Sequence, residues 1–203
     1  FLKSKGVAKK DIMETYTPFG HSDYQTIVAD IKKFAAGKPT AVVSTINGDS
    51  NVPFYKELGN QGLKAEDIPV VAFSVGEEEL RGIDTKPLVG HLAAWNYFMS
   101  VKTPENKAFI KKWNAYVKKN KLPGGSKRVT NDPMEATYIG IKMWAQAVEQ
   151  AGTTNIDAVR QAIGGQTVQS PSGFEITMDA KNHHLHKPVV IGEIQEDGQF
   201  EVV

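Results

Sequence analysis

Apolar runs and helical repeats alternate along the first half of the chain. Residues 40–46 and 68–74 are rich in β-branched and other apolar side chains, the pattern of parallel strands that are buried on both faces. A helix is predicted over residues 24–34, where apolar residues recur at helical spacing after the capping residues Ser22 and Asp23. Strands and helices that alternate with short connections predict an α/β fold, in which helices flank a parallel sheet.

The same patterns predict elements along the rest of the chain. Further strands are predicted at 11–17 and 88–97, and further helices at 53–58, 77–81, 104–118, 132–150 and 155–163. Residues 122–126 read Leu-Pro-Gly-Gly-Ser, which is typical of a linker. The chain ends in strand-like segments at 173–178, 189–194 and 200–203. We therefore expect the chain to leave the sheet after the linker and to return to it near the end.

The first six residues have the pattern of a helix C-terminus. Two lysines precede Gly6, and glycine is the usual residue just beyond a helix end. The body of that helix is absent, and neither an initiator Met nor a signal-peptide pattern is present. We expect the sequence to be a piece of a longer protein, with any export signal upstream of it.

Composition narrows the classes of function. Hydrophobic residues make up 40% of the chain and charged residues 23%, which is ordinary for a globular protein. The 24 basic residues nearly balance the 23 acidic ones, so the basic excess of a nucleic-acid binder is missing and nucleic acid is not an expected partner. The chain has no cysteine, which excludes disulfides, thiolate catalysis and thiolate metal sites but leaves the compartment open.

Motifs for catalysis, nucleotides or metals give little support to an enzyme. The chain has no phosphate-binding glycine loop, no GxSxG elbow and no HExxH motif, so neither a catalytic residue nor a cofactor is predicted. His183, His184 and His186 could offer two or three zinc ligands. Adjacent histidines in an extended segment point to opposite faces, and no acidic pair completes the set, so a structural turn is the favoured interpretation and no metal is expected.

Polar turns follow the predicted strands at the edge where a parallel sheet binds ligands. They lie at 18–23, at 47–50 and at 74–78, and each leads into a helix whose free N–H groups favour a carbonyl oxygen or an anion. A simple cap and turn is the alternative for each. The carboxylates of residues 77–79 could accept hydrogen bonds from a ligand or merely favour the first turn of a helix. Trp95, Tyr97 and Phe98 could line a pocket or pack in the core.

Longer segments of the chain resemble a known family, the type I periplasmic solute-binding proteins of the branched-chain amino acid and amide class. Within that family the chain is similar to the urea-binding components of urea ABC transporters. The resemblance covers nearly the whole chain in order, and it is carried by residues 20–24, 47–52, 73–75, 90–98, 103–106, 132–136, 182–185, 187–188, 191–194 and 197–200.

The resemblance implies a Rossmann-like lobe of a two-lobe protein that closes about a hinge over its solute. Residues 1–125 would form the second lobe without its first strand. Residues 126–168 would be a helical crossover that packs on the first lobe, and residues 169–203 a strand tail that returns to the second. The histidine turn near residue 182 becomes surface or hinge structure. Four apolar residues of the long helix would lack first-lobe partners and favour self-association: Ile139, Met143, Trp144 and Val148.

The function that the resemblance implies is capture of urea outside the cytoplasm, in the periplasm or, for an extracellular membrane-associated protein, outside the cell, and delivery to an ABC permease. Short amides and branched-chain amino acids are the alternative solutes. A cytoplasmic amide-sensing regulator of the same fold is an alternative function, and an α/β hydrolase or nucleotide enzyme is the enzymatic one. Because a lobe is missing, we expect the chain by itself to bind urea weakly or not at all.

Urea has one carbonyl acceptor and four N–H donors, so its site needs several acceptors around a small slot. The residue types at the strand ends suit it, with aromatic walls beside them and one carboxylate at the start of the long helix. The predicted ligand-binding residues are Asn47, Gly48, Asp49, Ser50, Ser74, Val75, Glu78, Trp95, Tyr97 and Glu135.

Overall fold

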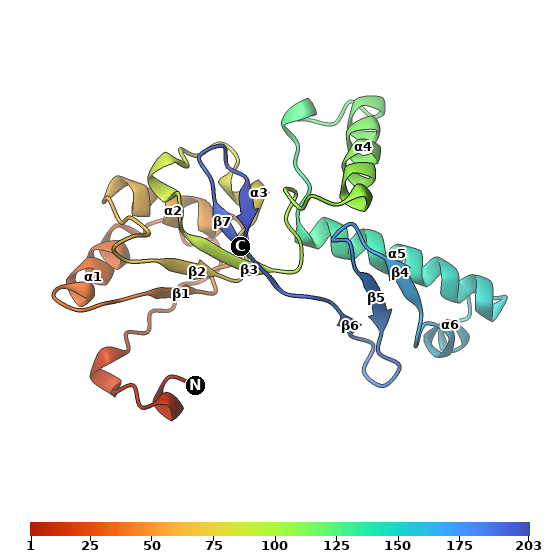
Figure 1. Ribbon diagram of the computed structural model, residues 1–203, viewed down its shortest axis with the longest axis horizontal. Coiled ribbons are helices and arrows are strands. Elements are labelled where there is room, and N and C mark those ends of the chain that lie inside the picture. Colours follow the sequence, from red (N-terminus) through yellow and green to blue (C-terminus); the bar gives the residue numbers. More distant parts are fainter.

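The computed structural model describes residues 1–203, which form two bodies side by side (Figure 1). The main body is built on a five-stranded sheet in the order β1-β2-β3-β7-β8. The first three strands are parallel, whereas β7 runs antiparallel to β3 and β8 antiparallel to β7. The strands are β1 (Val42–Ser44), β2 (Val70–Ala72), β3 (Leu92–Trp95), β7 (Val190–Ile194) and β8 (Phe200–Val202). The predicted α/β fold is confirmed, with a mixed sheet.

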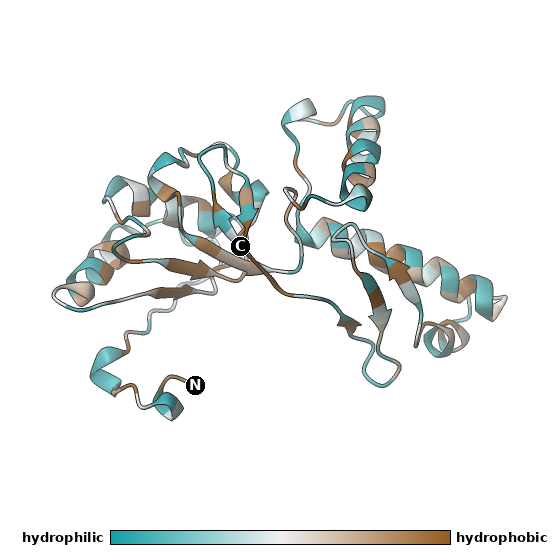
Figure 2. Cartoon of the chain, in the orientation of Figure 1, coloured by the Kyte–Doolittle hydropathy of each residue, from teal (hydrophilic) through white to brown (hydrophobic).

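Helices α1 (Gln25–Ala35), α2 (Asn51–Asn60) and α3 (Glu77–Leu80) belong to the main body. Apolar side chains of α1 and α2 pack with those of the sheet into one core, in which Val28, Leu58 and Val70 are fully buried. In Figure 2 strands β1 and β2 of this sheet are coloured mainly brown, as hydrophobic segments. The core therefore lies on the sheet, as the apolar strand runs predicted.

The second body packs a small sheet and a short helix on the long helix α5 (Asp132–Ala151). Strands β4 (Thr167–Gln169), β5 (Glu175–Met178) and β6 (Leu185–His186) form an antiparallel sheet, and α6 (Ile156–Ala162) packs on the C-terminal half of α5. Helix α4 (Pro104–Lys119) precedes α5 and contacts its first half through Phe109 and Tyr138, whose rings lie 4.9 Å apart. None of the helices combines the length and the apolar character that a membrane-spanning segment needs.

The topology corrects the expectation that residues 169–203 return to the second lobe as one tail. Strands β5 and β6 stay with α5, where Ile176 and Met178 pack against it, and only β7 and β8 join the main sheet. A strand pattern does not indicate which sheet the strand joins, so the sequence could not assign residues 173–178 to the second sheet.

The expected apolar patch on the long helix is also corrected. Ile139 and Met143 are fully buried under the second sheet, and Val148 is half-buried. Trp144 is 50% exposed, as predicted, and its exposed neighbour on the helix is Ile141. The second sheet covers the face that a strand-free crossover would have left open.

The predicted strand at 11–17 is wrong. Residues Lys9–Asp11 form a 3-10 turn, and residues 12–17 carry no ladder hydrogen bonds. They run instead beside the edge strand β1, across a groove of about 430 Å³ lined by residues 11–19 and 40–47. The other predicted strands and helices are confirmed with shifted ends, and Gly6 ends a 3-10 turn in the left-handed conformation, with φ of 85°.

His91 is a buried polar link in the main body. Its Nδ1 accepts a hydrogen bond from the Val70 amide at 3.1 Å, so Nε2 carries the proton that is donated to the Leu63 carbonyl at 3.2 Å. Burial lowers the pKa of His91 below its ordinary value of 6.5, and the Leu63 contact opposes that shift. The neutral imidazole is therefore the form that fits the fold.

We expect acid to destabilise the main body through His91. As the pH falls below about 6.5, the unfolded chain takes up a proton at this imidazole, whereas the folded chain does so only at lower pH. The free energy of unfolding therefore decreases as the pH is lowered through that window. Thermal unfolding of the wild type and of His91→Gln between pH 7.5 and 5 measures this. The variant should lose part of the pH dependence; equal slopes for the two proteins would contradict the assignment.

Candidate functional site

The carboxyl ends of β1, β2 and β3 meet at one edge of the main sheet because these strands are parallel and in register. Residues Asn47–Ser50 follow β1, Ser74–Gly76 follow β2, and Asn96 follows β3. The sequence predicted polar turns at the first two of these ends, and the structure brings those two into contact. The predicted turn at 18–23 follows no strand of the structure.

Asn51, which the sequence analysis did not single out, joins the ends of β1 and β2. Its Nδ2 donates to the carbonyls of Ile46 at 2.9 Å, of Gly48 at 3.2 Å and of Ser74 at 3.1 Å. The side chain is fully buried, and its Oδ1 has no hydrogen-bond partner. The clamp holds the two turns in one place. One feature of the sequence indicates this role: Asn51 is a polar residue at the start of α2, and the other buried residues of that helix are Phe54, Tyr55 and Leu58.

Glu77 is the carboxylate that lies at the end of β2. It is 1% exposed, its Oε1 accepts a hydrogen bond from the Met99 amide, and its Oε2 has no partner. Burial raises the pKa of Glu77 to about 7, against the lowering effect of the amides of Glu77 and Met99, and Glu79 and Asp132 raise it further. A buried acceptor of this kind requires a hydrogen-bond donor.

The neighbouring carboxylates have other partners. Glu79 reaches back to the Gly76 amide at 2.8 Å and caps α3. Glu78, which the sequence analysis favoured, lies in solvent and pairs with Arg81. Three consecutive acidic residues on one helical turn point in three directions, so Glu77 takes the place of Glu78 in the candidate site.

Two predicted aromatic residues lie near this edge, and only Tyr97 differs from its expected role. Tyr97 is fully buried, and its hydroxyl contacts Asn106 Oδ1 and Thr130 Oγ1, each at 2.7 Å, so it holds the loop and does not line a slot. Trp95 lies against the turn at Gly76, where an added Cβ would approach the indole ring to 2.7 Å. Glycine at position 76 is what lets the indole lie there.

The other predicted residues lie in different surroundings. Asn47, Gly48 and Asp49 are exposed at the turn after β1, Ser74 is half-buried and Val75 is buried. The Ser50 hydroxyl is buried without a partner, and Ser50 lines the groove beside β1. All of these residues follow strands at the carboxyl edge of the sheet. Asn47 and Ser50 line the groove beside β1, whereas Glu77 lies at a separate hollow with Met99 and residues 80–86.

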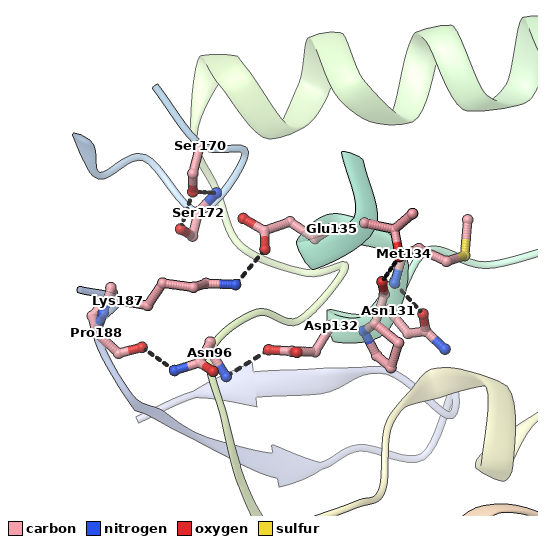
Figure 3. A network of polar contacts seen from close by, with 11 residues as sticks. Asn96, Asn131, Asp132, Met134, Glu135, Ser170, Ser172, Lys187 and Pro188 are labelled. Atoms are coloured by element: carbon pink, nitrogen blue, oxygen red, sulfur yellow. Dashed lines mark hydrogen bonds and ion pairs between the residues drawn. The ribbon is translucent and has the colours of Figure 1, made fainter. Parts of the chain in front are cut away.

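A polar network lies where the two bodies meet (Figure 3). Asp132, in the first turn of α5, accepts a hydrogen bond from the Asn96 amide at 2.8 Å, and Asn96 Nδ2 donates to the Pro188 carbonyl at 2.7 Å. Lys187 Nζ lies 2.6 Å from Glu135 Oε2. Glu135 is fully buried and its Oε1 has no partner, so the predicted residue sits at the junction of the bodies.

The junction holds more negative than positive charge. Burial raises the pKa values of Asp132 and Glu135, and Lys187 opposes the shift at both. The charge of Asp132 raises the pKa of Glu77, so the junction acts electrostatically on the carboxylate at the end of β2.

The histidine cluster forms no metal site in the structure. His183 and His184 are exposed in the turn between β5 and β6, and His186 contacts Asp179 at 3.2 Å. No group of three or more His, Cys, Asp or Glu side chains is arranged to hold a metal ion. The residues form the turn that the sequence analysis favoured.

Solved structures show which class of protein has this fold. A solute-binding protein of an ABC transporter from Rhodopseudomonas palustris HaA2, in complex with p-hydroxybenzoic acid, superposes with a TM-score of 0.73 at 24% identity over 91% of this chain and 48% of that one. The leucine-binding protein of Thermotoga maritima MSB8 gives a TM-score of 0.64 at 16% identity, over 91% and 48% of the two chains. The fold is that of the type I periplasmic binding proteins, and the chain spans about half the length of these neighbours.

The family follows from the sequence itself. The model of the family described as "Periplasmic binding protein domain" matches residues 1–203, and the chain belongs to that family. A curated protein of Geobacillus stearothermophilus named limonene hydroxylase is 34% identical over 119 residues, which are 59% of this chain and 20% of that protein. The solved neighbours are named as ABC transporter binding proteins, whereas this curated protein carries the name of an enzyme.

Proposed function

We propose that this chain is half of a two-lobe solute-binding protein, which captures a small polar solute at the carboxyl ends of β1 to β3 and delivers it to an ABC permease. The solute would lie against the turns at 47–49 and 74–76, with Glu77 as the principal acceptor. The family match and the two-body architecture support this proposal. The role needs no catalytic residue and no cofactor.

The free oxygen of Glu77 is the observation that carries the choice of solute. A buried carboxylate oxygen without a partner suits a solute that donates N–H groups. Urea and short amides offer such donors without a charge of their own. We therefore place them first, as the resemblance to urea-binding proteins also implies.

Other solutes fit these residues less well. Amino acids come second, because the carboxylate of an amino acid needs a cation and Arg81 is already paired with Glu78. Aromatic acids, which the Rhodopseudomonas neighbour binds, come third, because an anion beside Glu77 requires this group to be protonated.

The cellular role that we propose is extracytoplasmic, either in the periplasm or extracellular and membrane-associated. The alternative is a cytoplasmic amide-sensing regulator of the same fold. The two are separated by the sequence that precedes this chain in its gene, because an exported binding protein requires a signal peptide there.

Calorimetric titration tests the solute. Urea, acetamide, leucine and 4-hydroxybenzoate are titrated into the longer protein that we propose contains this chain, and into the 203-residue chain as the control. We expect the longer protein to bind urea or acetamide and the chain to bind neither measurably. Binding of leucine or 4-hydroxybenzoate alone would overturn the choice of solute, and the absence of binding by all four would contradict the proposed binding of small amides.

We also expect the isolated chain to self-associate through α5. Ile141 and Trp144, three residues apart on one helical face, are 62% and 50% exposed. Light scattering over a range of concentrations should show dimers that Ile141→Gln/Trp144→Gln removes, whereas Tyr116→Gln on α4 leaves them. A single monomeric species at every concentration would contradict this expectation.

A further inference from the structure

We propose that Lys187 is a positioning residue, which fixes the orientation of the two bodies through its buried ion pair with Glu135. The inference rests on the proposed function, in which the main body belongs to one lobe and the second body packs on the other, and it names the contact that sets how the two bodies are oriented. Lys187 touches no solute in this proposal. It acts through the linker between β6 and β7.

The pair differs from every other ion pair of the chain in its burial. The Lys187 and Glu135 side chains are 8% and 0% exposed, whereas the side chains of the other ion pairs are all at least 24% exposed. Exposed pairs are screened by water and contribute little. A buried pair is not screened, so its geometry is strongly preferred once it forms.

The pair also lies where the bodies are connected. The chain leaves the main sheet after β3, at Asn96, and returns to it through residues 187–189. The first turn of α5 contacts both connecting segments. Asp132 accepts a hydrogen bond from the backbone amide of Asn96, and Glu135 pairs with Lys187. The connecting segments also contact each other, from Asn96 Nδ2 to the Pro188 carbonyl (Figure 3).

The positive charge of Lys187 acts on both carboxylates in the first turn of α5, those of Asp132 and Glu135. Its charge lowers the pKa values of Asp132 and Glu135, which burial raises. Without it, two buried acidic groups would face each other at the junction. The ion pair therefore attaches the linker that carries Lys187 to α5. If one body rotates relative to the other, either this ion pair breaks or the linker moves together with α5.

A distance measurement tests the proposal. The chain has no cysteine, so Lys33→Cys on α1 and Glu149→Cys on α5 give one exposed label site in each body. All variants carry Ile141→Gln/Trp144→Gln, so that dimers do not add distances between two chains. Spin labels at the two sites then report the distance distribution between the bodies by double electron–electron resonance. The test variant is Lys187→Met/Glu135→Met, which removes both charges together because the single change leaves a buried charge and can prevent folding. The matched control is Lys86→Met, whose partner Glu196 is exposed within the main body.

We expect one narrow distance for the parent chain and for Lys86→Met, and a distribution at least twice as broad for the double variant at unchanged helix content. A folded double variant that keeps the narrow distance would overturn the proposal, as would a broad distribution in the parent chain. No solute is present in this measurement, so a failure of the proposed solute binding would be seen in the calorimetry alone.

Discussion

Glu77→Gln weakens the binding of urea or acetamide to the two-lobe protein by roughly 10- to 100-fold, the range expected when a charged acceptor of a hydrogen bond becomes neutral. Glutamine keeps the size of the side chain and an oxygen for the Met99 amide, so the change falls on the charge and on the free oxygen. Titration calorimetry at pH 8 measures the effect.

The neighbouring Glu78→Gln is the matched control. It makes the same chemical change one residue further along α3, at a side chain that lies in solvent beside Arg81. The control should bind as the wild type does. Equal loss in both variants, or in neither, would remove Glu77 from the site.

The same carboxyl predicts the pH dependence of binding. Its pKa of about 7 means that Glu77 is ionised above that pH and protonated below it. A solute that donates N–H groups to Glu77 should therefore bind more tightly as the pH rises from 6 to 8, and this rise should vanish in Glu77→Gln. A carboxylate solute would show the opposite trend.

Lys187→Met lowers the free energy of unfolding by about 3–5 kcal/mol, because it leaves Glu135 as a buried carboxylate without a partner. The double change Lys187→Met/Glu135→Met should recover most of this loss, since two well-packed apolar side chains can replace a buried ion pair. Thermal or guanidinium unfolding is the suitable measurement, because urea is a candidate solute. A loss under 1 kcal/mol in the single variant would show that water reaches the pair.

The sequence predicted the long helices well because their signals are local. Thr103 and Pro104 predicted the start of α4, and Thr103 accepts a hydrogen bond from the Asn106 amide as a capping residue does. The strand at 11–17 failed for the opposite reason. A strand requires a partner edge, and the residue types at 11–17 could not supply one. Strands as short as β4 and β6 carry too few residues to show any period.

The strand-end location of the site could be predicted from sequence, but its contacts could not. Three successive glutamates cannot be told apart by residue type. Only the position of α3 in the fold directs Glu77 into the interior and Glu78 toward Arg81. The aromatic side chain of Tyr97 suggested a pocket wall, yet partners from α4 and from the loop before α5 take up its hydroxyl. Glu135 was singled out without its partner, because Lys187 lies 52 residues further along the chain.

The order of strands in the main sheet has a consequence for folding kinetics. Strand β7 pairs with β3 in the register Leu92↔Glu193, so the whole second body is inserted between two neighbouring strands. Contacts between residues so distant in sequence form slowly, because a long loop must close first. On a ribosome, β1, β2 and β3 emerge early, and β3 keeps an unpaired edge until the last residues of this chain are made. During that interval the free edge of β3 is open to pairing with a strand of another chain.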